Sequence, residues 1–70
     1  MTSIPIKEPN TVTPEEVCEA LRREIAVRVR IYPRWVENDR LTLGKASHEI
    51  AAMKAALVIA EEYAARFRLL

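Results

Sequence analysis

Apolar residues recur every three or four positions over two stretches of the chain, and this period is typical of amphipathic α-helices. In the first stretch the recurring residues are Cys18, Leu21, Ile25, Val29, Tyr32 and Val36. In the second the spacing alternates between three and four, as in a heptad repeat, through Leu43, Ala46, Ile50, Met53, Leu57, Ala60, Ala64 and Phe67. We therefore expect an all-α chain with long helices over residues 14–37 and 42–68.

The first helix has a defined beginning. Thr13 is a preferred N-cap residue, and Pro14 follows at the first helical position, where a missing N–H costs nothing. Glu16 stands three residues after the cap, which predicts a capping box. In this motif the Thr13 hydroxyl accepts a hydrogen bond from the Glu16 amide, and the Glu16 carboxylate accepts one from the Thr13 amide.

Pro33 lies inside the first helical stretch. Proline lacks the N–H that would bond to the Val29 carbonyl, and it costs about 3 kcal/mol in a straight helix. The apolar period continues in phase to Val36, so we expect one helix that is kinked at Pro33. The alternative is a break that folds residues 33–41 over the first helix. Asn38 is the residue expected to turn the chain out of the helix.

A short polar link joins the two helices, and Thr42 is a suitable N-cap for the second. Long helices joined by four or five residues form an antiparallel hairpin. We expect this two-helix hairpin to be one domain over residues 14–70. Residues 1–13 contain two of the four prolines and no helical period, so they are expected to form an extended N-terminal arm, and the alternative is a frayed terminus.

The first helix carries a second apolar stripe beside the first, and a single facing helix can cover only one of them. Its residues are Val17, Ala20, Val27, Ile31 and Trp35. Residues 50–60 of the second helix are apolar on nearly every side. Exposed apolar surface of this extent is typical of interfaces, so we expect two hairpins to form a twofold homodimer and a four-helix bundle. The expected dimer interface comprises Val17, Glu24, Val27, Arg28 and Ile59.

The composition gives little support to catalysis or metal binding. The 70 residues include 11 Lys and Arg against 10 Asp and Glu, with one cysteine, one histidine and one glycine. Such numbers leave no disulfide pair, no zinc ligand set and no glycine-rich phosphate loop. We expect His48 to be an ordinary surface residue and Cys18 a core residue. The chain is therefore expected to have no enzymatic activity, no catalytic residue, no cofactor and no metal.

No apolar run reaches the length of about 18 residues that a membrane helix needs, so no membrane partner is expected. The first residues lack a basic segment followed by an apolar one, which is the pattern of a secretory signal. A lone thiol without an export signal is typical of proteins in a reducing compartment. We expect a cytoplasmic protein.

Residues 30–35 concentrate the side chains that dominate protein interfaces, namely arginine, tyrosine and tryptophan. Trp35 lies too far from the first apolar stripe for the hairpin alone to enclose it. We expect a surface that binds a partner protein, formed by Arg30, Ile31, Arg34 and Trp35. The alternative is that Trp35 and Tyr32 only close the end of the bundle core, or that Trp35 belongs to the dimer.

Nucleic-acid binding is a second hypothesis for the same region. Residues 22–36 hold five arginines and one glutamate, and arginines beside aromatic rings contact phosphates and bases. The whole chain, however, has a net charge of only +1, and a dedicated nucleic-acid binder of this size is normally more basic. We therefore favour a protein partner.

Two segments within residues 21–57 read LRREIAVRVRIYPRWVENDRL and ASHEIAAMKAAL. They resemble a recurrent group of small phage and prophage proteins of unassigned function. Small phage proteins of this kind often bind and inhibit a host factor. The resemblance therefore implies a non-enzymatic accessory protein that binds and modulates a host or phage protein. The alternatives are a nucleic-acid-associated factor and a structural or assembly subunit of a phage particle.

Overall fold

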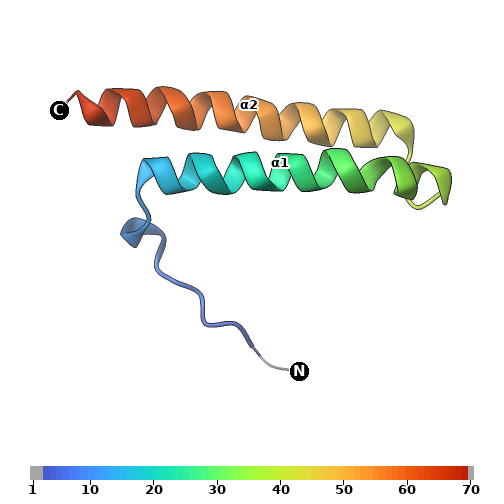
Figure 1. Ribbon diagram of the computed structural model, residues 1–70, viewed down its shortest axis with the longest axis horizontal. Coiled ribbons are helices and arrows are strands. Elements are labelled where there is room, and N and C mark those ends of the chain that lie inside the picture. The colour runs from blue at the N-terminus through green and yellow to red at the C-terminus, as the bar shows by residue number, and fades with distance from the viewer. Residues whose placement is uncertain (1–2, 70) are drawn as a thin grey trace.

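The structure, a computed structural model, describes residues 3–69 and consists of two long helices that run antiparallel, side by side (Figure 1). A 3-10 turn, η1 (Pro9–Thr11), precedes α1 (Pro14–Glu37), and a five-residue link leads to α2 (Leu43–Arg68). The expected all-α hairpin is confirmed. The molecule is 14 Å deep along its shortest axis, and a single helix with its side chains is about 10–12 Å wide. The hairpin is therefore one layer thick.

Residues 3–8, before η1, lead away from the helices (Figure 1). Ile4 and Ile6 in this segment are 84% and 91% exposed, so their side chains do not pack on the hairpin. η1 then brings the chain to the start of α1. Residues 1 and 2 of the expected arm lie outside the described residues.

The predicted capping box at the start of α1 is present. The Thr13 hydroxyl accepts a hydrogen bond from the Glu16 amide at 3.1 Å, and the Glu16 carboxylate accepts one from the Thr13 amide at 2.9 Å. The bond from the Thr13 amide lowers the pKa of Glu16. A lowered carboxyl pKa contributes stability that is complete above the ordinary pKa and is lost as the pH falls through the lowered one. Thr42 caps α2 by accepting from the Lys45 amide at 3.1 Å.

α1 continues as a single helix through Pro33. The prediction of one continuous helix is confirmed, and the alternative of a break that folds residues 33–41 over α1 is wrong. Because Pro33 has no N–H, the Val29 carbonyl receives no helical hydrogen bond from that position. The kink at Pro33 stays a prediction.

The chain leaves α1 at Asn38, which is the C-cap residue as predicted, but the left-handed conformation of the turn is adopted by Asp39. Asp39 has a φ of 56°, in the left-handed region, whereas Asn38 has a φ of −92°. The Asp39 amide donates to the Val36 carbonyl at 3.2 Å. The Arg40 amide donates to the Trp35 carbonyl at 2.9 Å. These two bonds form a Schellman motif, which satisfies carbonyl groups that the end of a helix leaves free.

The contact between the helices is built on every seventh residue of α1. Cys18, Ile25 and Tyr32 are buried, as are the small residues Ala46 and Ala64 of α2. Alanine at these positions allows the helices to approach closely, because the distance between helix axes depends on the side chains in the contact. Within residues 3–69 no large side chain is completely enclosed. The hairpin therefore has a line of contact rather than a closed core.

Three residues that we expected in the contact between the helices are instead exposed. The exposed fractions of Val29, Leu43 and Phe67 are 48%, 72% and 53%. At about 100° per residue, each lies about 40–60° from the line of the buried residues. In a hairpin of one layer, only the residues nearest this line face the other helix. The sequence therefore predicted too many residues in the contact between the helices.

Two ion pairs join the helices near the chain termini. Arg22 pairs with Glu61 at 2.9 Å, and Glu15 pairs with Arg68 at 3.2 Å. Both pairs have the same antiparallel register, since a step of seven residues back along α1 matches seven residues forward along α2. All four side chains are about half exposed or more, so each pair contributes only about 0.2–1 kcal/mol. Their main effect is to favour this register.

Replacing Asp39 with glycine is expected to stabilise the hairpin by about 0.5–1 kcal/mol, because glycine adopts a positive φ without the steric cost of a side chain. Urea unfolding followed by circular dichroism measures the change. Asp39→Ala is the matched control, since it removes the carboxylate but keeps the Cβ, and it is expected to give no gain. Equal stability of the two variants would contradict a left-handed residue at this position.

Pro33→Ala is expected to raise the helix content and to stabilise the chain by about 2 kcal/mol. The restored hydrogen bond and the removed ring clash gain about 3 kcal/mol, and the more flexible unfolded chain takes back about 1 kcal/mol. Far-ultraviolet circular dichroism and urea unfolding measure both effects. Pro14→Ala, at the first helical position, is expected to change stability little. Loss of folded structure in Pro33→Ala would overturn the continuous helix.

Candidate protein-interaction surface

One side of the hairpin carries most of the large apolar side chains that the helices leave exposed, and we call it the apolar face. At about 100° per residue, its α1 residues lie on one side of that helix. They are Val17, Leu21, Glu24, Val27, Arg28, Ile31 and Trp35. The α2 residues are Lys45, Glu49, Ala52, Ala56, Ile59, Tyr63 and Phe67. A groove and an ion pair that join the two sets place them on the same side of the hairpin.

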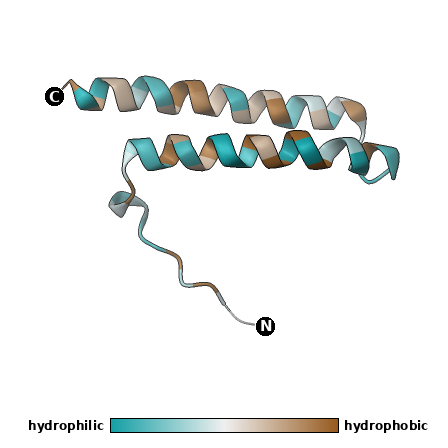
Figure 2. Cartoon of the chain, viewed as in Figure 1, coloured by the Kyte–Doolittle hydropathy of each residue, from teal (hydrophilic) through white to brown (hydrophobic). Residues whose placement is uncertain are grey.

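The five residues expected at the dimer interface all belong to the apolar face. Glu24 and Arg28 lie near its middle and Val17 near the start of α1, while Val27 and Ile59 lie at its outer edges. Ile59 is 68% exposed and Val17 is 40% exposed, so both are open to a second chain. Hydrophobic residues recur along the whole length of both helices, and polar residues interrupt them throughout (Figure 2).

At the end of the hairpin near the chain termini, the apolar face is hollowed into a groove of about 750 Å³. It is lined mainly by Val17, Leu21, Ile59, Tyr63 and Phe67, and the residues of η1 close one side. The rings of Tyr63 and Phe67 stack with centroids 6.2 Å apart. Both rings are more than half exposed, so the groove is open and predominantly apolar.

At the opposite end, near the link, Trp35 forms a second apolar patch. Its ring stacks on the ring of Tyr32 with centroids 5.5 Å apart and an interplanar angle of 29°. Tyr32 is 8% exposed and Trp35 is 38% exposed. The buried tyrosine therefore supports one side of the indole and leaves the other side to solvent. Ile31, one turn before, is half-buried.

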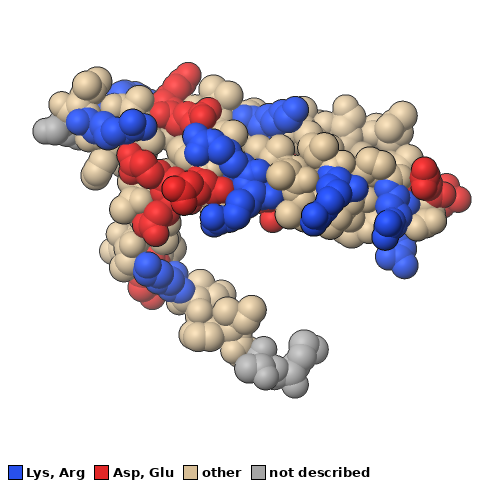
Figure 3. All heavy atoms as spheres, in the orientation of Figure 1, with Lys and Arg blue, Asp and Glu red and all other residues tan. Residues whose placement is uncertain are grey.

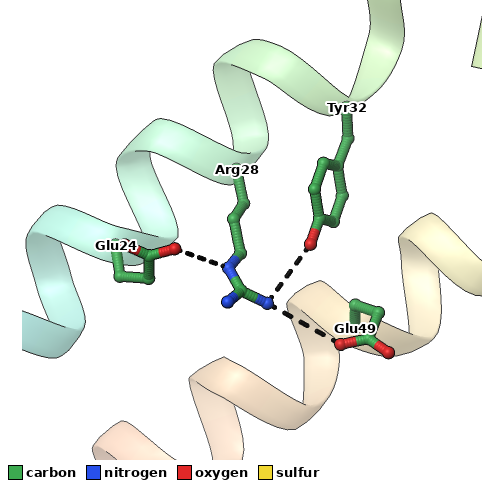
Figure 4. Close-up of polar contacts among 4 residues, drawn as sticks. All are labelled: Glu24, Arg28, Tyr32 and Glu49. Carbon is green, nitrogen blue, oxygen red and sulfur yellow. Dashed lines mark hydrogen bonds and ion pairs between the residues drawn. The ribbon is translucent and has the colours of Figure 1, made fainter. Parts of the chain in front are cut away.

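Between these two ends lies a polar cluster centred on Arg28 (Figure 4). Its Nε donates to Glu24 at 2.9 Å, and its Nη1 donates to the Tyr32 hydroxyl at 3.2 Å. The same Nη1 lies 3.7 Å from Glu49 of α2. The hydrogen bond to Glu24 raises the pKa of Arg28, because the carboxylate stabilises the charged guanidinium. The arginine thus connects both helices at the middle of the apolar face.

The four residues expected to bind a partner do not all lie together. Ile31 and Trp35 belong to the apolar face, and the exposed Arg34 lies about 60° from Ile31 around the helix. Arg30 is exposed but lies about 140° from Trp35. It shares instead a strip with Arg23 and Arg34 on the side of α1 that points away from α2, and we call this strip the arginine edge.

The arginine edge is basic, although the net charge of the whole chain is only +1. On the side shown in Figure 3, basic side chains follow α1 from its middle to the link, and acidic ones gather where α1 begins. Among residues 3–69 the arginines found in ion pairs are Arg22, Arg28 and Arg68. The arginines of the edge are therefore available to a partner.

Several contributors to this surface were missed at the level of the sequence. The groove depends on Tyr63, Phe67 and η1, and the polar cluster depends on Glu49. Tyr63 and Phe67 are four residues apart, a spacing that places two rings on one side of a helix, and this signal was available. The contribution of Glu49 was not, because it depends on how the two helices align.

Within residues 3–69, His, Cys, Asp and Glu side chains form no group of three or more that would hold a metal ion. Cys18 is a free thiol, 3% exposed. Neither α1 nor α2 has the apolar length that a membrane crossing requires. Comparison of the chain with protein-family models, curated proteins and solved structures finds no match.

Proposed function

We propose that the chain is a non-enzymatic accessory protein that acts as a homodimer and binds and modulates another protein. The observation that carries this proposal is the open apolar face. Trp35, Ile59, Tyr63 and Phe67 are between 38% and 68% exposed, while only five residues of the described chain are buried. Exposed apolar patches of this kind mark sites where another chain binds.

We propose a homodimer because a single hairpin buries so few residues. A chain of 70 residues supplies one small core, and domains of this size commonly gain stability from a partner. A second hairpin placed on the apolar face would complete a four-helix bundle and cover Val17, Glu24, Val27, Arg28 and Ile59. A bundle has a closed core, which the single layer lacks.

We assign the foreign partner to the region of Arg30, Ile31, Arg34 and Trp35. The arginine edge favours a partner with an acidic surface, because opposite charges steer association and fix orientation. The resemblance to small phage and prophage proteins favours a host or phage protein as the partner, with inhibition as the mode of action. The buried free thiol of Cys18 is compatible with the reducing host cytoplasm.

Nucleic acid is the second candidate, and the observation that favours it is again the arginine edge. Arg23, Arg30 and Arg34 are exposed on one strip, and phosphates bind such strips in a strongly salt-dependent way. Glu19 and Glu37 lie near the two ends of this strip and repel phosphate. For this reason the protein partner is preferred.

The chain is expected to behave as a dimer of about 16 kDa, twice the 8.0 kDa of one chain, in light scattering after size exclusion at micromolar concentration. Ile59→Glu, on the apolar face, is expected to weaken the dimer at least tenfold without loss of helix within each chain. Val58→Glu is the matched control, since Val58 is also exposed but lies on the other side of α2. A stable 8.0 kDa monomer with a cooperative thermal transition would contradict dimerisation.

Arg34→Glu is expected to fold normally and to lose partner binding by about 2 kcal/mol or more, the size of an interface hot spot. The partner is first identified by affinity capture from host lysate and mass spectrometry, and binding is then measured with the purified partner by calorimetry. Arg66→Glu, an exposed arginine outside the arginine edge, is the control. Binding of Arg34→Glu at the wild-type level would exclude this edge, and a steep loss of binding at moderate salt with a DNA or RNA probe would favour nucleic acid.

A further inference from the structure

We infer that the occupant of the apolar face is the same face of a second copy, turned end to end, so that the two α1 helices lie antiparallel across a twofold axis. This inference rests on the proposed homodimer and specifies its geometry. It comes from the order of the side chains along α1. Apart from Val27 at the outer edge, the α1 residues of the apolar face read Val17, Leu21, Glu24, Arg28, Ile31 and Trp35.

This order is complementary to its own reverse. Counted from Ala26, Glu24 and Arg28 are equally distant on either side, and they carry opposite charges. In an antiparallel pair of α1 helices centred on Ala26, Glu24 of each copy faces Arg28 of the other. The twofold axis makes both contacts identical, which is the requirement for an isologous interface. A parallel pair would instead place Arg28 against Arg28.

The apolar residues obey the same symmetry. Leu21 and Ile31 are equally distant from Ala26, and so are Val17 and Trp35. In the antiparallel pair, Trp35 of each copy therefore lies over Val17 of the other, at the groove lined by Tyr63 and Phe67. The open side of the indole, which Tyr32 leaves to solvent, would be covered by apolar and aromatic side chains. Two such contacts form, one at each end of the dimer.

α2 has an equivalent centre at Ala56. Small residues lie at equal distances from it, Ala52 on one side and Ala60 on the other, so two α2 helices can approach closely at their crossing. Further out, Glu49 mirrors Tyr63 and Lys45 mirrors Phe67. The first of these pairs sets a carboxylate against a phenol hydroxyl, and the second sets an ammonium group against an aromatic ring.

The two centres lie at the same level of the hairpin. The ion pair between Arg22 and Glu61 sets the register. Ala26 is four residues beyond Arg22, and Ala56 is five residues before Glu61. Because the helices are antiparallel, the Arg22–Glu61 pair places Ala26 and Ala56 within one residue of the same height, about 1.5 Å, and the longer Arg28–Glu49 contact places them within five residues. A single twofold axis perpendicular to the helices therefore passes near the centres of both patterns.

The charges of the face also cancel. Glu24 and Glu49 are balanced by Arg28 and Lys45, so two faces meet without net repulsion. The arginine edge points away from this contact and is left open on both copies. In this arrangement the second copy covers Ile31 and Trp35, so of the four residues proposed for the foreign partner only Arg30 and Arg34 stay accessible to it.

A cysteine on the twofold axis tests the geometry directly. Ala56→Cys, in a Cys18→Ala background, is expected to form a disulfide-linked dimer within minutes of adding diamide, because the introduced thiol faces its own copy across the axis. Ala52→Cys is the control on the same face. Its copy in the second chain is about 12 Å away along the helix direction, so it is expected to cross-link at least tenfold more slowly. Linkage is read on a non-reducing gel.

The charges give a second and independent test. Glu24→Arg and Arg28→Glu are each expected to weaken the homodimer at least tenfold, and an equimolar mixture of the two variants is expected to dimerise at the wild-type level, since opposite charges then face each other across the axis. A fold defect would not be repaired by mixing. Glu62→Arg, on the outer side of α2, is the control and leaves the dimer unchanged.

The outcomes separate this inference from the proposed function. A wild-type dimer in light scattering with no fast cross-linking of Ala56→Cys, or with no rescue on mixing, would overturn the antiparallel arrangement but leave the homodimer in place. A wild-type monomer would overturn the homodimer itself.

Discussion

Two helices that pack side by side bury one stripe of each, and this limit governs the whole molecule. α1 has two apolar stripes, and only the one through Cys18, Ile25 and Tyr32 reaches α2. The second stripe lies open on one side of a hairpin that is one layer thick. The apolar surface that the fold cannot cover is thus the surface from which a function is inferred, because its exposure in water is unfavourable until another chain covers it.

Much of the fold could be predicted because its signals are local. The capping box at Thr13 depends on residues three positions apart, and the apolar period through Pro33 indicated a helix that the proline does not end. The turn at Asp39 could not be predicted, since Asn38 and Asp39 both tolerate a positive φ and the choice between them depends on where the last helical bonds close. The number of residues in the contact between the helices depends on how many layers the fold has. The apolar period of a single helix does not indicate the number of layers.

The candidate surface was predictable only in part, for the same reason. The second stripe of α1, with Trp35, follows from spacing within one helix. The contact of Arg28 with Glu49 and the groove at Phe67 depend on the register between the helices. That register is set by weak surface ion pairs, such as Arg22 with Glu61, together with the fit of small residues in the contact. Neither the ion pairs nor the fit of the small residues produces a repeating pattern in the sequence from which the register could be predicted.

α1 carries both proposed interactions on different sides, and this separation allows them to occur together. The side toward the apolar face has Glu24 and Arg28 between apolar ends, a pattern suited to a second copy, whereas the arginine edge has Arg30 and Arg34 and almost no apolar residue. Dimerisation on the first side, as proposed, would stabilise the helix that presents the second. α2, with alanines at the close contacts, would pack against the second copy as well as against α1. A partner bound at the arginine edge would then meet a rigid surface, and little conformational entropy would be lost in ordering it.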